Sequence, residues 1–224
     1  MAEVGAYCAT NPALWLHLDG AFAGSAAVCP ELRWVNDGME LVDSYCFNPH
    51  KWLLTNFDCS LLWVTDRSAI LHALSVLPEY LRNAASESGA VIDYRDWMVP
   101  LGRRFRSLKL WMVIRHYGAE GLRAFIRNHV ALGLELADWI DEDDRFERVA
   151  PAPLALVCFR LRAGDDATKS VLEAVNARGT HYLTHTVLDG NYVIRVAIGA
   201  IRTDRAEVEA LWSEICERTE GLTT

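Results

Sequence analysis

The sequence predicts an α/β fold, in which part of a large parallel-sheet domain is followed by a small α+β domain. The apolar runs at 15–18 and 45–47 are too short to show a period, which is typical of parallel strands buried on both faces. Both runs end in polar residues, and ligands of α/β proteins bind at the carboxyl ends of such strands. Beyond residue 150 the pattern becomes strand, helix, hairpin and helix, which favours a second, smaller domain.

The remaining elements of the first part follow in order. Pro30 begins a short helix, and the run at 59–64 predicts another strand. Asp66 is a suitable N-cap for a helix through Leu74. The soft stretch at 77–94 predicts a long loop, and long loops inside compact enzymes are usually lids or disordered segments.

Two helices lead into the second part. The first, at about 103–117, is expected to stop at Gly118, and the second carries an apolar stripe from Leu122 to Ile140. The later elements are a strand at 154–162, a helix at 167–177, a hairpin of 180–187 and 192–198 about Asp189-Gly190, and a last helix around 208–215. We therefore expect two domains, 1–118 and 119–224.

The composition argues against several classes of protein. The chain has 224 residues and a net charge of −8, whereas a nucleic-acid-binding surface is basic. No apolar run approaches the ~20 residues that cross a bilayer, and the first residues lack the features of a signal peptide. Six cysteines without a CxxC spacing fit reduced, buried thiols. We expect a cytoplasmic protein that binds neither nucleic acid nor membranes.

A lysine in an apolar setting follows the second strand. Asn48-Pro49 ends that strand, and His50 and Lys51 lie on the turn before Trp52. Apolar neighbours that bury an amine lower its pKa, and the neutral amine is a nucleophile for a carbonyl. A surface turn with a solvated lysine explains the same residues about as well.

An acid at the end of the first strand adds a second chemical group. Asp19 is followed by two small residues, Gly20 and Ala21, and lies some 30 residues before Lys51. In enzymes that use pyridoxal 5′-phosphate (PLP), a lysine forms the Schiff base and an acid holds the pyridine nitrogen protonated. The two residues therefore match that division of labour.

Three stretches carry a resemblance to a known family. They are 16–25 (LHLDGAFAGS), 47–52 (FNPHKW) and 100–109 (PLGRRFRSLK). In this order they closely resemble the group II PLP-dependent decarboxylases, above all the aromatic-L-amino-acid decarboxylases, and the resemblance runs over nearly the whole chain. It implies the PLP-dependent transferase-like fold (fold type I) and PLP as the cofactor.

The resemblance assigns roles to individual residues. Lys51 matches the Schiff-base lysine, and Asp19 matches the acid that keeps the ring protonated so that it accepts the electrons released as CO2 leaves. The remaining matches are contacts of the cofactor: His50 positions it, Asn48 contacts its phosphate and Ala21 lies on its ring face. As residues alone, His50 is also explained as a partner of the turn, and Asn48 as a turn former. The family usually has alanine at Gly20, a departure that is not expected to affect the electronics.

Two further matches concern the substrate. Tyr80 matches the tyrosine on the mobile catalytic loop that delivers a proton to Cα, although a tyrosine in a lid could simply pack. Gly102 matches a position near the substrate ring, where glycine leans towards indoles. Lys51, His50 and Tyr80 are thus the expected catalytic residues.

Two other groups of residues have open explanations. Arg103, Arg104, Arg106 and Lys109 form a basic cluster at a helix start, which suggests an acidic partner or equally a solvated face. His181 and His185 share the face of a predicted strand, but without a third ligand a polar sheet face is the expected explanation and no metal site is predicted.

The expected activity is decarboxylation of an aromatic L-amino acid to its amine. An aromatic aldehyde synthase of the same family is an alternative, and Tyr80 argues against it because that branch typically has phenylalanine there. Another alternative is a non-catalytic chain that acts only as a partner of a full-length subunit. The cofactor's phosphate loop, the stacking histidine and the segment that intertwines the family's dimer have no counterpart here. We therefore expect the C-terminal half of a homodimeric enzyme, with weak PLP binding and no useful activity alone.

Overall fold

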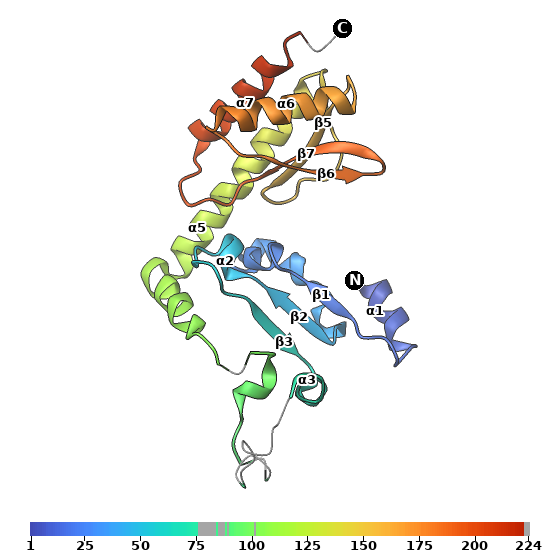
Figure 1. Cartoon of the computed structure of the whole chain (residues 1–224), viewed down its shortest axis with the longest axis vertical. Helices are drawn as coiled ribbons and strands as arrows, with labels where there is room; N and C mark the ends of the chain where they lie inside the picture. Colours follow the sequence, from blue (N-terminus) through green and yellow to red (C-terminus); the bar gives the residue numbers. More distant parts are fainter. Residues whose placement is uncertain (76–83, 85–87, 89, 101, 222–224) are drawn as a thin grey trace. The chain divides into compact units, whose positions relative to one another are not determined.

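The computed structural model describes residues 1–75, 84, 88, 90–100 and 102–221. By its internal contacts the chain divides into two compact units, Met1–Ala119 and Glu120–Thr224. Figure 1 colours and labels the elements of both units along the sequence. Each unit is described by itself.

Unit 1 is built on a three-stranded sheet with the order β1-β2-β3. The strands are β1 (His17–Asp19), β2 (Ser44–Phe47) and β3 (Leu61–Val64). β1 runs parallel to β2, and β2 runs antiparallel to β3. The three predicted strands are confirmed, and so is the parallel pairing of the first two, which brings their carboxyl ends to one edge of the sheet.

Short helices connect the strands of unit 1. The connection between β1 and β2 consists of 3-10 helices, and the one that begins with Pro30 confirms the predicted short helix. The three 3-10 helices of this connection are Ala23–Val28, Pro30–Asn36 and Met39–Leu41. α1 (Ala2–Ala9), which was not predicted, precedes β1, and α2 (Pro49–Trp52) directly follows β2.

The end of β3 leads into α3 (Arg67–Leu74), whose predicted cap is confirmed. The Asp66 carboxylate accepts a hydrogen bond from the Ser68 amide at 2.8 Å. A 3-10 helix, Tyr94–Trp97, comes later in the chain. Most of the predicted loop at 77–94 lies outside the described residues.

The expected end of the first helix at Gly118 is confirmed, because two helices meet across a kink at this residue. α5 spans Arg106–Glu142 and contains one non-helical residue, Gly118, with φ 62° and ψ 179°. A glycine adopts this conformation readily, so the first helix ends here and the second begins directly after it. The predicted stripe from Leu122 to Ile140 is confirmed as the buried side of the later part of α5.

Unit 2 contains a four-stranded antiparallel sheet with the order β4-β5-β7-β6. Its elements are β4 (Phe146–Arg148), β5 (Leu156–Leu161), α6 (Asp165–Arg178), β6 (Thr184–Leu188), β7 (Asn191–Ala197) and α7 (Arg205–Thr219). All but β4 were predicted. The turn of the predicted hairpin is made by Asp189 and Gly190, both with positive φ, as a two-residue turn between twisted strands requires.

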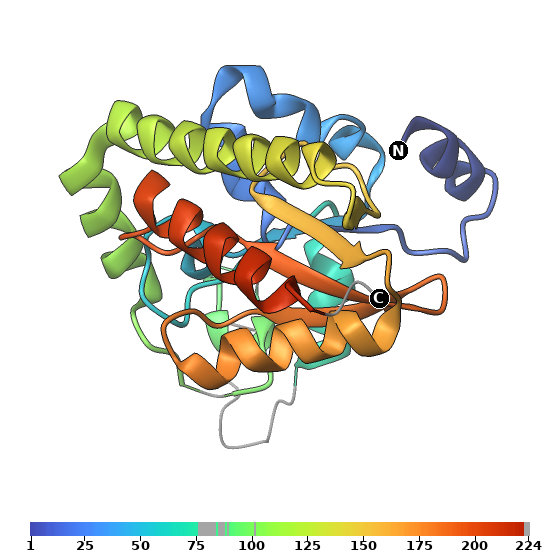
Figure 2. The same cartoon turned by 90° about the horizontal axis from the view of Figure 1, so that it is seen from above.

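The core of unit 2 lies between this sheet and its helices. α6 and α7 contact each other and lie over the same face of the sheet (Figures 1 and 2). Along β5 the side chains alternate, and Val157, Phe159 and Leu161 are fully buried.

Two expectations from composition can be compared with this structure. Among the described residues, no helix combines the length and the apolarity that crossing a membrane needs. All six cysteines are free thiols; Cys29 and Cys59 are buried as expected, while the other four are only half-buried.

Candidate active site

The candidate site lies at the carboxyl edge of the sheet in unit 1. Asp19 is the last residue of β1, and its register partner on the parallel strand β2 is Cys46. β2 ends at Phe47, and α2, which carries Lys51, begins two residues later. Because parallel strands end at the same edge, the fold brings Asp19 and the turn of Lys51 together, as the sequence predicted.

The Asp19 carboxylate is held at one of its two oxygens. Oδ1 accepts a hydrogen bond from the Ala21 amide at 2.8 Å and one from the Cys46 thiol at 3.5 Å. The Ala21 amide is the main cause that lowers the pKa of Asp19, and the thiol and the charge of Lys51 lower it further, against a smaller opposing effect of burial. Within the described part of the chain Oδ2 has no hydrogen bond, and the side chain is exposed. Asp19 is therefore an ionised group with one oxygen free for a ligand.

The expectation that apolar neighbours bury Lys51 is wrong for this structure, in which Lys51 is exposed. Its neighbour Trp52 is completely buried and stacks on Phe22, with ring centroids 4.4 Å apart. Successive residues of a one-turn helix point in directions about 100° apart, so Trp52 turns inward while Lys51 turns outward.

His50 and Asn48 are both fixed by the segment that precedes β3. Nδ1 of His50 lies 3.0 Å from the amide nitrogen and 2.7 Å from the carbonyl oxygen of Cys59. Either tautomer of His50 can therefore form a hydrogen bond with the main chain of Cys59. The His50 ring also meets the ring of Phe57 edge-on, at 4.9 Å. Asn48 Oδ1 accepts a hydrogen bond from the Ser60 hydroxyl at 2.6 Å. Nothing in the sequence pointed to Cys59 and Ser60 as the supports of these two residues.

Ala21 joins the two strand ends through its main chain. Its amide donates to Asp19, and its carbonyl accepts the Asn48 amide at 3.0 Å. The predicted cofactor contacts Asp19, Ala21 and Asn48 thus form one hydrogen-bonded group beside Lys51.

Comparison with known proteins decides the family. Residues 1–162 match the pyridoxal-dependent decarboxylase conserved domain. The chain belongs to this family.

Individual relatives agree with this membership. The chain is 49% identical over 219 residues to tyrosine decarboxylase 2 of Narcissus pseudonarcissus, which covers 95% of the chain and 44% of the relative. It is 48% identical to phenylacetaldehyde synthase of Arabidopsis thaliana, over 99% of the chain and 46% of the relative. It thus spans about half the length of the curated relatives it matches.

A solved structure shows the same fold. The crystal structure of Oryza sativa TDC with PLP and tryptamine superimposes with a TM-score of 0.87 at 44% identity, covering 95% of this chain and 46% of that one. The fold is therefore the α/β fold of the PLP-dependent decarboxylases, fold type I, as the sequence predicted.

The chain has glycine at position 20, where the resemblance led us to expect alanine. A Cβ placed on Gly20 lies 2.8 Å from Cε2 of Tyr45 and 3.0 Å from its Oη. A Cβ on Gly24 would come even closer to the same hydroxyl, which donates a hydrogen bond to Asn36 at 3.2 Å. The two glycines thus make room for the Tyr45 ring beneath the loop that follows Asp19.

The Gly20→Ala substitution is accordingly expected to destabilise unit 1 by about 1–3 kcal/mol, because the added methyl group overpacks against the ring. In a Tyr45→Leu background the same substitution should cost less, since the ring is gone. Gly102→Ala is the matched control, because no described heavy atom beyond the neighbouring residues lies within 4 Å of a Cβ placed there. Urea unfolding of the single and double variants measures the coupling; equal costs in both backgrounds would contradict this account.

The structure does not test the roles that the resemblance gives to Tyr80 and Gly102, the two residues expected to face the substrate. Tyr80 lies outside the described residues, so its predicted role stays a prediction. Gly102 is described and exposed, and its surroundings are open. Its assignment to the substrate ring also stays a prediction.

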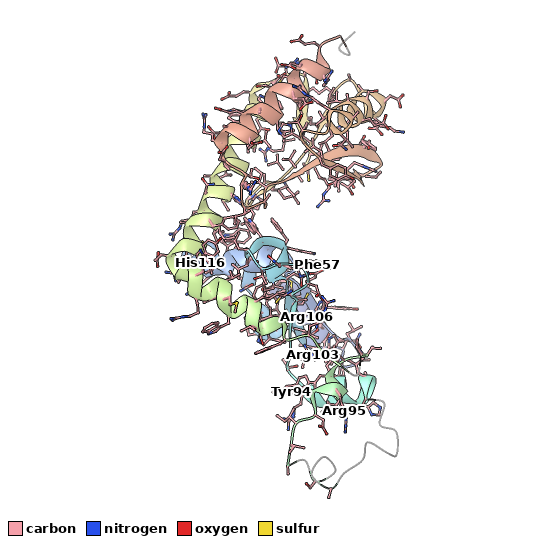
Figure 3. The ribbon with its side chains drawn as sticks, turned by 60° about the vertical axis from the view of Figure 1, so that its left-hand side comes forward. Phe57, Tyr94, Arg95, Arg103, Arg106 and His116 are labelled. Carbon is pink, nitrogen blue, oxygen red and sulfur yellow. The ribbon has the colours of Figure 1, made fainter. Side chains whose placement is uncertain are left out.

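The basic cluster lies at the start of α5 and partly before it, since the helix begins at Arg106 rather than at Arg103. Arg106 pairs with Asp58 at 3.0 Å, while Arg103 and Arg104 make no ion pair with any described residue. Figure 3 shows Arg103 and Arg106 at this helix start, with Arg95 and Tyr94 in the preceding segment. A groove of about 760 Å³ lies beside β3 and is lined by the side chains of Arg95, Arg103, Arg104 and Arg106.

A second, mostly apolar cavity of about 530 Å³ lies elsewhere in unit 1. It is lined by Tyr45, Phe47 and Trp63 among others, and neither Asp19 nor Lys51 borders it. It is therefore separate from the candidate active site.

The two histidines of unit 2 have different surroundings. His185 lies on β6 and stacks on Tyr192, with ring centroids 4.6 Å apart. His181 lies before β6 begins, so its predicted place on that strand is wrong, and its Nδ1 is 3.0 Å from a carboxylate oxygen of the buried Glu214. The described residues contain no group of three or more side chains suited to a metal ion.

Proposed function

We propose that this protein is a PLP-dependent carboxy-lyase that converts an aromatic L-amino acid into the corresponding amine and CO2. A relative named as a tyrosine decarboxylase and a related structure that holds tryptamine support the substrate class. The observation that carries the proposal is the pair of groups at the sheet edge: the half-free Asp19 carboxylate, and Lys51 on the turn after the neighbouring strand.

The donor set at this edge fits PLP. A primary amine suits the cofactor's aldehyde, and an ionised carboxylate with a free oxygen suits a protonated pyridine nitrogen. Lys51 would hold the aldehyde carbon and Asp19 the ring nitrogen. His50, Asn48 and Ala21 would complete the site as contacts of the ring and the phosphate.

When bound, PLP supplies an electron-poor ring that accepts the electron pair left behind as CO2 departs. Asp19 holds a proton at the pyridine nitrogen, and its lowered pKa keeps it ionised for this task throughout the neutral range. His50, anchored on the main chain of Cys59, keeps a fixed ring orientation beside Lys51. The Tyr80 hydroxyl then donates a proton to Cα of the substrate, which completes the amine.

The second candidate function is that of an aromatic aldehyde synthase. This candidate is supported by the 48% identity to phenylacetaldehyde synthase of Arabidopsis thaliana. Tyr80 supports the decarboxylase instead, because a phenol with a pKa near 10 is protonated at neutral pH and can donate its proton. A third candidate, of another class, is a non-catalytic chain that only partners a complete subunit.

The substitution Tyr80→Phe distinguishes the first two candidates. It keeps the ring but removes the proton, so we expect amine formation to fall about a hundredfold or more. Dissolved dioxygen then oxidises the substrate instead, and aldehyde, ammonia, CO2 and hydrogen peroxide appear. The assay uses this chain together with the portion of the Narcissus relative that it does not match, with tyrosine, DOPA and tryptophan as substrates. Unchanged amine production would assign the proton to another residue. Aldehyde as the main product of the unsubstituted protein would support the synthase.

We also propose that the active protein is a cytoplasmic homodimer. Several large apolar side chains at the start of α5 are exposed and could be covered by a second copy. They are Phe105, Leu108, Trp111, Met112 and Ile114. Light scattering of the purified protein tests the dimer, and a monomeric mass at micromolar concentration would argue against it. Fluorescence of a tagged protein in cells tests the location.

A further inference from the structure

We propose that Cys46 is a positioning residue of the active site, whose thiol holds the Asp19 carboxylate by Oδ1 and so leaves Oδ2 aimed at the ligand. This inference deepens the proposed PLP-dependent function and rests on it. From the sequence, Cys46 was expected only to be one of six reduced, buried thiols.

The strand pairing is what places the thiol there. Asp19 and Cys46 are register partners on adjacent parallel strands, so their side chains leave the sheet on the same face, side by side. The thiol donates to Asp19 Oδ1 at 3.5 Å, within the range of a hydrogen bond that involves sulfur. The Cys46 carbonyl also accepts the Gly20 amide at 2.9 Å. Cys46 therefore binds the loop after β1 through its main chain as well as its side chain.

The thiol is in the right protonation state to act as a donor. Burial is the main cause that raises the pKa of Cys46, and the charge of Asp19 and the hydrogen bond to it raise it further. The Gly20 amide and the charge of Lys51 oppose this shift without reversing it. Cys46 is thus an uncharged S–H group at neutral pH, and an S–H group beside a carboxylate donates to it.

The two donors on Oδ1 have a common consequence for the other oxygen. The Ala21 amide is the stronger donor, and together with the thiol it saturates Oδ1. Oδ2, without a partner among the described residues, is then the oxygen available to a pyridinium N–H. If the thiol merely filled space, any small apolar side chain would serve equally well at this position.

The first test needs no cofactor and uses the purified 224-residue chain. Iodoacetamide labelling of Cys46, followed by peptide mass mapping, reports how strongly Asp19 holds the thiol. In the Asp19→Asn variant we expect several-fold faster labelling near neutral pH, with the labelling profile moved to lower pH, because the neighbouring negative charge is gone. Cys158, a half-buried thiol of unit 2, is the internal control and should not change. Equal labelling of Cys46 in both proteins would overturn the proposal.

The second test compares Cys46→Ser with Cys46→Ala in the PLP-loaded protein. Serine keeps a donor of similar size, so it should retain the absorbance spectrum and PLP affinity of the unsubstituted protein. Alanine should weaken PLP binding several-fold and shift the spectrum, because Asp19 is no longer held. Identical behaviour of the two variants would reduce Cys46 to a space-filling residue. If no variant binds PLP while the labelling test succeeds, the proposed function fails but the contact between Cys46 and Asp19 stands.

Discussion

Replacing Lys51 by alanine is expected to abolish the site-specific attachment of PLP to this chain. PLP reacts with primary amines, and borohydride fixes it on the amine with which it has reacted. The chain has only two other lysines, Lys109 and Lys169, so peptide mapping gives an unambiguous result. In the unsubstituted chain the label should be on Lys51, and in Lys51→Ala the total should fall about tenfold or more, to the background of Lys109, Lys169 and the N-terminal amine.

The expected selectivity follows from what surrounds each amine. Lys51 lies beside an ionised Asp19, which can hold the pyridine nitrogen while the amine holds the aldehyde. Lys169 is exposed, and its nearest carboxylate is that of Glu173 on the same helix. Lys109 belongs to the arginine-rich start of α5, where the carboxylate of Asp58 is already paired with Arg106. Lys109→Ala and Lys169→Ala are the matched controls and should leave the labelling of Lys51 intact.

Two outcomes would contradict this prediction. Equal labelling of all three lysines would mean that the sheet edge confers no preference for PLP. Labelling that survives in Lys51→Ala but is lost in Lys109→Ala would move the cofactor site to the groove beside β3. Clean labelling of Lys51 without turnover, in the assay that includes the unmatched portion of the Narcissus relative, would favour the silent partner chain over the enzyme.

Much of this site could be predicted because its residues lie in short, contiguous motifs. The apolar runs predicted β1 and β2, and the acid and the lysine after them identified the edge at which they meet. α7 was equally predictable, since Val208, Leu211 and Ile215 recur at helical spacing and are buried in the structure.

What escaped prediction depends on orientation and pairing rather than on residue type. The exposure of Lys51 is set by rotation within a one-turn helix, which a list of apolar neighbours does not contain. Cys46 and Cys59 act through register and through main-chain contacts, and both depend on which strands pair.

The second large effect is expected from Asp19→Asn. This substitution keeps the size and the hydrogen-bond acceptor at Oδ1 but removes the negative charge. A neutral amide cannot stabilise a proton at the pyridine nitrogen, so the ring becomes a poorer electron acceptor. Attachment of PLP to Lys51 should persist, whereas kcat should fall about a hundredfold or more, which corresponds to roughly 3 kcal/mol of barrier.

Two measurements separate the effect of the Asp19 charge on turnover from its effect on cofactor binding. Borohydride labelling of Lys51 in Asp19→Asn shows whether the cofactor still attaches, and the decarboxylase assay, run with the unmatched portion of the Narcissus relative present, measures turnover. Asp19→Glu is the matched control, since it restores the charge one methylene further out and should recover part of the loss. Asp66→Asn serves as a distant control, because that carboxylate only caps α3. A near-normal kcat in Asp19→Asn would show that another acid holds the ring nitrogen. A loss of labelling together with turnover would mean that Asp19 secures the binding of the cofactor rather than its electronic state.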